Sequence, residues 1–124
     1  MLKVLGLAGV VMIALNAPLI AGECPIESLD VDQVERAITA APSCQAAHRM
    51  MNDCRRNASS DVELARIVIG KCESRFVSRL SSARKKAYET ERGSCGTRYA
   101  TTRGTMGASF QATCEAGVAA KFAR

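Results

Sequence analysis

Among the side chains that could support chemistry in this 124-residue chain are six cysteines and a single histidine. Cys44 and His48 are four residues apart, so on a helix they would share one face, as two ligands of a metal ion do. A zinc site needs about four ligands, and the sequence has no second histidine. A Cys–His nucleophilic pair needs a free thiolate, which a disulfide removes. We therefore expect no metal, no cofactor and no cysteine-based catalysis.

Two nearby carboxylates, Asp61 and Glu63, could act as the acid and base of a glycoside hydrolase. Both fall in the first turn of a predicted helix, where acidic residues stabilise the helix dipole, and we favour this structural role. The basic cluster of residues 84–86 has no interleaved aromatic residue and does not indicate nucleic-acid binding. The sequence contains neither a phosphate-binding loop nor a catalytic triad, so we expect a non-enzymatic protein.

The N-terminus has the pattern of a secretory signal peptide. A single lysine precedes an almost wholly apolar run, residues 4–20, and the small residues Ala21 and Gly22 follow it. We expect residues 1–22 to be the signal peptide, cleaved after Ala21 or Gly22, and residues 23–124 to form a single domain. A retained membrane anchor is the alternative, but glycines and a proline interrupt the run and no basic stop-transfer cluster follows it.

All six cysteines follow the predicted signal peptide. Export together with an even number of cysteines indicates disulfides rather than a metal or redox site. The chain has only three phenylalanines and two tyrosines, and no tryptophan, so its core must be small. Each disulfide in such a domain typically adds ~2–4 kcal/mol to the free energy of unfolding. We expect an exported protein with no stable membrane span after signal cleavage.

Apolar residues recur at helical spacing throughout the mature chain, and no segment shows the alternation of a strand. Asp30, Ser43 and Ser60 are predicted N-caps, with Ser60 and Glu63 forming a capping box, and Pro42 ends the first helix. The predicted inward rows are Val31, Val34, Ile38 and Ala41; Cys44, Ala47, Met51 and Cys54; Val62, Ala65, Ile69, Cys72, Phe76 and Leu80; Ala87, Tyr88, Cys95 and Tyr99; and Met106, Phe110, Cys114, Val118 and Phe122. The predicted fold class is all-α: a small disulfide-stapled antiparallel bundle of five helices, or of four if the break at Ser81 is only a kink.

Helix geometry constrains the last disulfide. Cys95 lies nine residues before Gly104 and Cys114 lies ten residues after it, and Gly104 separates two predicted helices. In an antiparallel hairpin, residues equidistant from the turn face each other. We therefore predict a Cys95–Cys114 disulfide that locks the hairpin.

The same argument bears on the other four cysteines, for which spacing alone does not choose a pairing. Cys44 and Cys72 have a midpoint inside the predicted loop before Ser60, and Cys24 and Cys54 have one close to Pro42. The rival pairing, Cys54–Cys72 with Cys24–Cys44, places both midpoints inside predicted helices. We predict Cys24–Cys54 and Cys44–Cys72.

Charge is distributed unevenly along the mature chain. Residues 23–54 contain six acidic and two basic residues, a net charge of −4, whereas residues 55–124 contain fourteen basic and six acidic residues, a net charge of +8. Such asymmetry marks an oppositely charged partner in some proteins and is only a solvated helix surface in others.

The chain from Cys54 onward also carries an ordered pattern of residue types. Its members are Cys54, Asp61-Val62-Glu63-Leu64, Tyr88, Arg92, Cys95, Arg103-Gly104-Thr105-Met106 and Cys114. This pattern resembles the lysozyme inhibitor LprI-like family of exported bacterial domains. Cys95, Arg103-Gly104-Thr105-Met106 and Cys114 match in order and spacing, whereas the interval from Arg92 to Cys95 is one residue shorter and Tyr88 stands where that family has tryptophan. The resemblance implies a helical, cystine-containing fold, a periplasmic or secreted bacterial protein and no catalytic residue.

The same resemblance implies binding to a lysozyme or another envelope protein. Most lysozymes are strongly basic, so an inhibitor would present an acidic face. The acidic segment here is residues 27–35, and we expect Asp30, Asp32 and Glu35 to make the contact. The alternative is an envelope structural or interaction protein whose basic C-terminal half binds anionic surface polymers.

Overall fold

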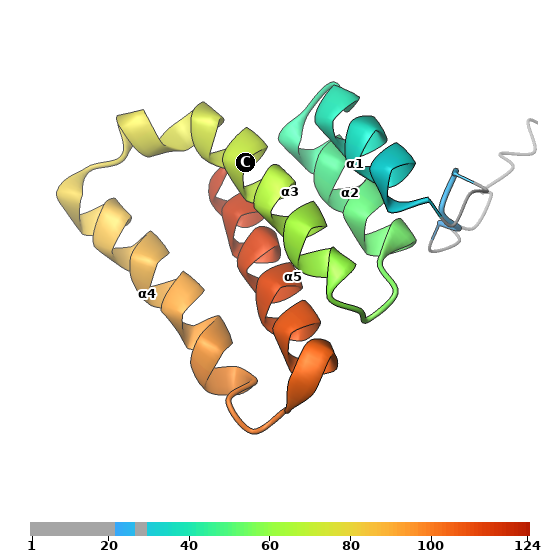
Figure 1. Cartoon of the computed structure of the whole chain (residues 1–124). Coiled ribbons are helices and arrows are strands. Elements are labelled where there is room, and N and C mark those ends of the chain that lie inside the picture. The colour runs from blue at the N-terminus through green and yellow to red at the C-terminus, as the bar shows by residue number, and fades with distance from the viewer. Residues whose placement is uncertain (1–21, 27–29) are drawn as a thin grey trace, which may run out of the picture.

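The computed structural model describes residues 22–26 and 30–124 (Figure 1). The predicted signal peptide, except Gly22, lies outside the described residues, as does Glu27 of the predicted acidic segment. The described part contains five α-helices and no strand, which confirms the predicted fold class. The helices are α1 (Val31–Ala40), α2 (Cys44–Cys54), α3 (Ser60–Phe76), α4 (Ser82–Arg98) and α5 (Gly104–Phe122), with a short 3-10 turn, η1 (Val77–Arg79), after α3.

Side-chain caps begin three of the helices. The carboxylate of Asp30 accepts a hydrogen bond from the Asp32 N–H at 3.0 Å, and the hydroxyls of Ser43 and Ser81 accept bonds from N–H groups one turn into α2 and α4. Since Leu80 is extended and Ser81 caps α4, the break before α4 separates two helices. The five-helix alternative is therefore the correct one.

The predicted capping box at Ser60 is wrong. Ser60 is already the first residue of α3, and Ser59 stands at the N-cap without a side-chain bond. The neighbouring Asp61 instead binds the backbone of the preceding loop: its carboxylate accepts hydrogen bonds from the N–H groups of Arg56 and Ala58, each at 3.1 Å. Glu63, the other member of the predicted box, pairs with Arg66 one turn further along the helix.

The helices form two hairpins that pack around α3 (Figure 1). The α1–α2 hairpin covers one side of α3, and α5 covers another and also contacts α2. The last helix pair is α4 and α5, with α4 packing on the outer side of α5. A lysine of α3 ties the first hairpin down, because the Nζ of Lys71 donates to the backbone oxygens of Thr39 and Ala41 at the end of α1.

The core has two parts. Aliphatic and sulfur-containing side chains, among them Ile38, Met51 and Val68, are fully buried between α1, α2 and α3. Three aromatic rings close the other end: Phe76 lies 5.0 Å from Tyr88, and Phe122 lies 5.1 Å from Tyr88, between ring centroids. The alanine-rich face of α5 joins the two parts.

The predicted inward row of α5 is wrong for most of its length. Met106 is 49% exposed, Phe110, Cys114 and Val118 are only half-buried, and Phe122 alone is buried. The buried face instead carries small residues: Gly107, Ser109, Thr113, Ala116, Ala119 and Ala120. Small side chains let the backbone of α5 approach that of α3 closely. The face of α5 that carries them is therefore the one buried against α3.

Several other positions predicted to face inward lie at the edge of the core. Val62 is 42% exposed, because its neighbour Asp61 occupies the buried position in the first turn of α3. Tyr99, at the end of α4, is half-buried, and so are Ile69 and Leu80.

Three disulfides staple the helices, and they are the pairs that the turn midpoints select: Cys24–Cys54, Cys44–Cys72 and Cys95–Cys114. The first ties the segment before α1 to the end of α2, the second joins α2 to α3, and the third joins α4 to α5. All three are typical of proteins that fold in an oxidising compartment. No helix among the described residues is both long and apolar enough to cross a membrane.

Candidate binding surfaces

Asp61, Cys44 and His48, which the sequence offered as candidates for chemistry, each bond to another residue of the fold. Asp61 is fully buried and accepts, besides its two loop N–H bonds, a hydrogen bond from the Ser109 hydroxyl at 2.6 Å. It does not meet Glu63 in a shared cleft. Cys44 is in a disulfide, and His48 lies beside Gly117 of α5, hydrogen-bonded to Asn52. Burial, and to a smaller degree the charges of two arginines, lowers the pKa of His48. The described residues contain no cluster of three or more metal-ligating side chains.

The residues of the family-like pattern hold the second hairpin together. Arg92 bridges two helices, donating to Glu73 on α3 at 2.9 Å and to Glu115 on α5 at 3.0 Å. The Tyr88 hydroxyl donates to the same Glu73 oxygen at 2.7 Å. Burial, supported by this hydrogen bond, raises the pKa of Tyr88 well above its ordinary value. These contacts give Tyr88 and Arg92 a role in packing α4 against α3 and α5.

Two of the predicted contact residues lie in one hollow. Asp32 and Glu35 of α1 line a hollow of about 490 Å³ between α1 and α3, and Glu63 joins them from α3. We call these three carboxylates and their surroundings the acidic hollow. Asp30 stands at the start of α1, where its carboxylate caps the helix. Glu63 was not among the predicted contact residues, because a helix-capping role accounted for it.

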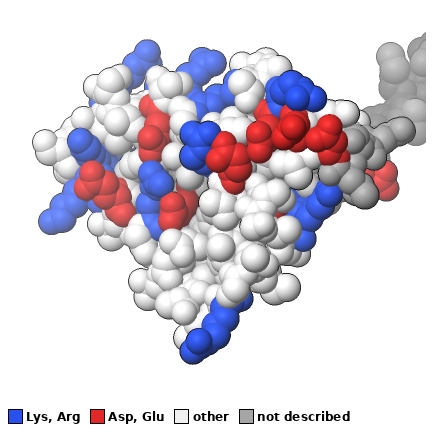
Figure 2. Space-filling view, viewed as in Figure 1, with Lys and Arg blue, Asp and Glu red and all other residues white. Residues whose placement is uncertain are grey.

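Basic residues offset much of the charge of the acidic hollow. Arg36 and Arg66 line it too, so three carboxylates meet two guanidinium groups. Arg66 forms a two-pronged ion pair with Glu63, and this hydrogen bonding lowers the pKa of the carboxyl. Acidic and basic side chains accordingly lie side by side over α1 and the neighbouring part of α3 (Figure 2). The charged side chains that line the acidic hollow therefore carry a net charge of −1.

The opposite kind of surface forms where α3 ends, α4 begins and α5 ends. Two arginines near the end of α3, Arg75 and Arg79, line a hollow of about 340 Å³ together with Ala123, which follows α5. Arg84 of α4 lies over the ring of Phe122, 4.6 Å from its centroid. Helices distant in sequence thus bring their cations together. We call this surface the basic end; its members are Arg75, Arg79, Arg84, Lys85, Lys86, Lys121 and Arg124.

Few of these cations are neutralised. Lys121 pairs with both carboxylate oxygens of Glu91, at 2.9 and 3.0 Å. The side chains of Arg75, Arg79, Lys85 and Lys86 form no hydrogen bond or ion pair with any residue that the structure describes. All four are exposed. Basic side chains line the upper and left edges of the molecule in the view of Figure 2, over the corner between α3 and α4.

No family model, curated protein or solved structure matches this chain.

Proposed function

We propose that this chain is an exported, non-enzymatic binding protein of the bacterial cell envelope that holds an anionic surface polymer at its basic end. The observation that carries the proposal is the set of seven cations around the end of α3, the start of α4 and the end of α5; Arg75, Arg79, Lys85 and Lys86 among them form no hydrogen bond or ion pair with a described residue. The basic end also has more uncompensated charge than the acidic hollow, which carries its own counter-charges.

Physical chemistry favours a polymer as the partner. A compact group of exposed cations attracts a polyanion over roughly a Debye length, ~8–10 Å, and raises its local concentration. Each exposed contact is weak alone, so many of them must act together, as they do along a chain of repeated charges. The disulfide-stapled frame presents the cations without the cost of ordering a flexible segment.

The test is binding of the oxidised chain, residues 23–124, to polygalacturonate, with neutral dextran as the comparison polymer. The variant Arg75→Glu/Arg79→Glu/Lys85→Glu should lose affinity by about tenfold or more, since each cation near an anionic surface contributes ~1 kcal/mol. The matched control is Arg36→Glu/Arg49→Glu/Arg103→Glu, which makes the same change of charge elsewhere and should bind much better than the basic-end variant. Binding should also weaken as salt is raised.

Equal losses in the two variants would mean that only net charge matters and would overturn the assignment to the basic end. Binding of dextran as tight as that of polygalacturonate would overturn the polymer class. Circular dichroism and thermal unfolding show whether each variant keeps the fold.

A second candidate function is inhibition of a lysozyme, as the resemblance to the LprI-like family implies. The specific observation in its favour is that Asp32, Glu35 and Glu63 share one hollow, which a basic partner could contact. The test is the rate of cell-wall lysis by a panel of lysozymes with and without the oxidised protein. Asp32→Lys/Glu35→Lys should abolish inhibition and leave the polymer binding of the basic end intact. Inhibition that survives the double reversal would remove the acidic hollow from consideration.

A further inference from the structure

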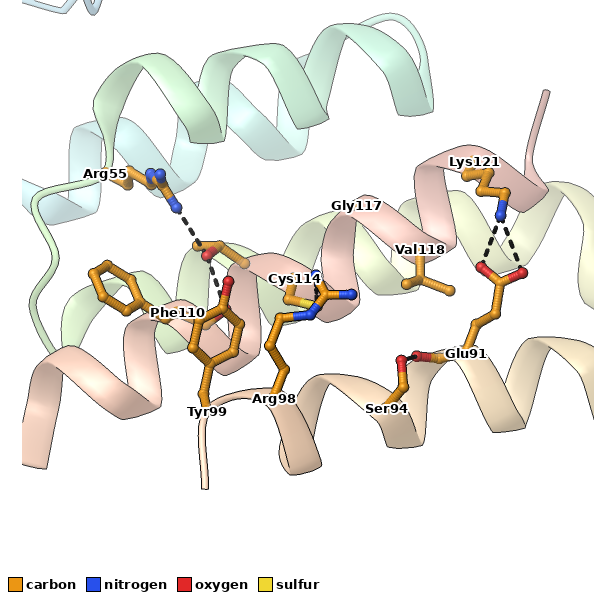
Figure 3. A pocket seen from close by; sticks show the side chains of 11 residues that line it. Arg55, Glu91, Ser94, Arg98, Tyr99, Phe110, Cys114, Gly117, Val118 and Lys121 are labelled. Carbon is orange, nitrogen blue, oxygen red and sulfur yellow. Dashed lines mark hydrogen bonds and ion pairs between the residues drawn. The ribbon is translucent and has the colours of Figure 1, made fainter. Parts of the chain in front are cut away.

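A groove of about 570 Å³ runs along the outer surface between α4 and α5 (Figure 3). Tyr99 and Phe110 stand at one end, with ring centroids 5.6 Å apart and planes tilted by 53°. Lys121 and its partner Glu91 stand at the other end. Arg55, which follows α2, reaches toward the groove from above and donates to the hydroxyl of Thr113 at 2.9 Å.

The groove combines flat apolar surfaces with cations. The rings of Tyr99 and Phe110 are both half-buried, so each keeps part of its surface open. Arg98 is exposed, and the one hydrogen bond of its guanidinium among the described residues is a long one, 3.9 Å to the Sγ of Cys114. Ser94 also lines the groove from α4, and its hydroxyl donates to the backbone oxygen of Glu91 at 2.6 Å (Figure 3).

This chemistry fits a sugar ring that bears a carboxylate. The C–H face of a pyranose packs on an aromatic ring, which offers a large rigid surface at low entropic cost. A planar guanidinium binds a carboxylate through two parallel hydrogen bonds. Arg98, the last residue of α4, and Tyr99, which follows it, supply both elements.

The groove is held open by the fold. The Cys95–Cys114 disulfide sets the distance between α4 and α5, with the two Cα atoms 5.8 Å apart. Gly117 adds no side chain to the floor, where it lies between the half-buried Cys114 and Val118 on α5. A ligand would therefore enter a site whose backbone is already in place, and it would lose less free energy to ordering the protein.

The groove continues from the basic end. Lys121 belongs to both surfaces, since it lines the groove and lies 5.8 Å from the ring centroid of Phe122, on which Arg84 also packs. A polymer held at the basic end can therefore extend along α5 into the groove. We propose that the α4–α5 groove binds one carboxylate-bearing sugar of an anionic polysaccharide, with Tyr99 and Phe110 packing on the sugar ring and Arg98 binding its carboxylate. This inference rests on the proposed function and names the class of polymer.

The experiment measures binding of trigalacturonate by calorimetry, with maltotriose as the neutral comparison. Arg98→Glu and Tyr99→Ala should each weaken trigalacturonate binding by about tenfold or more, because each removes a charged or stacking contact. Ser94→Trp should also weaken trigalacturonate binding, because Ser94 is exposed and a bulky ring there fills the groove without touching the core. The control variant is Arg49→Glu, at an exposed cation of α2 that does not line the groove, and it should bind the trisaccharide within about threefold of the unaltered chain.

Three results would overturn the inference: no binding of trigalacturonate to the unaltered chain, equal binding of maltotriose, or unchanged affinity in the folded groove variants. The two proposals fail separately. If polygalacturonate still binds at the basic end while the groove variants have no effect, the groove proposal falls and the proposed function stands. If neither polymer nor trisaccharide binds, both fall.

Discussion

The hydroxyl of Ser109 donates to the carboxylate of Asp61 at 2.6 Å, and neither side chain is exposed to solvent. This bond joins the first turn of α3 to the buried face of α5. Asp61 also holds the loop before α3 through the N–H groups of Arg56 and Ala58. One carboxylate therefore links the first hairpin, the central helix and the last helix.

Removing this carboxylate should destabilise the protein strongly. In Asp61→Ala the two loop N–H groups and the Ser109 hydroxyl lose their acceptor in the interior, and we expect the free energy of unfolding to fall by about 3 kcal/mol. Ser109→Ala removes one of the three bonds and should cost about 1–2 kcal/mol. Urea unfolding measures both. The control is Glu63→Ala, two residues away, whose solvent-screened ion pair should contribute little to stability; a loss as large as that of Asp61→Ala would contradict this account.

Arg92 should matter because it reaches two carboxylates, Glu73 and Glu115, at once, and all three side chains are a third exposed or less. Arg92→Ala leaves both carboxylates without their cation, so we expect a loss of about 1–3 kcal/mol in the free energy of unfolding. Arg92→Lys should recover only part of it, since an ammonium group lacks the planar fork that contacts two carboxylates. Full recovery by lysine would show that charge alone is enough. The matched control is Arg66→Ala, on an exposed pair.

Tyr88 should make stability depend on alkaline pH. Burial and the bond to Glu73 raise its pKa, so the folded state favours the neutral phenol more than the unfolded chain does. The contribution is complete below the unfolded value of 10.0 and is lost as pH rises above it. The difference in unfolding free energy between the native chain and Tyr88→Phe should therefore shrink above about pH 10. Tyr99→Phe is the control, and a difference that stays constant with pH would argue against the assignment.

Two glycines should respond in opposite directions to alanine. A Cβ at Gly107 would overlap the backbone oxygen of Thr102, so Gly107→Ala must displace the turn between α4 and α5. We expect a loss of about 2–3 kcal/mol. Gly70 is exposed in the middle of α3, and a Cβ added there would meet no neighbouring atom within 4 Å, so Gly70→Ala should stabilise the helix by about 0.5–1 kcal/mol. Thermal unfolding of the two variants checks both signs.

Much of the fold follows from the sequence because its determinants are local. Helical periodicity placed the helices and left only the break at Ser81 open, and short polar side chains before an apolar row located the caps at Asp30 and Ser43. The disulfide pairs followed from the same information, since residues equidistant from the turn of an antiparallel hairpin lie opposite each other. Cys95 and Cys114 meet for that reason.

The candidate surfaces depended on tertiary structure. A row of apolar residues shows which side chains share a face, but not which face meets a neighbouring helix at the closest approach. On α5 the small residues on the face of Ser109 are buried against the neighbouring helices, whereas Phe110 lines a groove together with Tyr99. The burial of Asp61, the meeting of Glu63 with Glu35, and the convergence of cations at the basic end were decided in the same way. Each joins residues from different helices, and only the packing of those helices sets their distance.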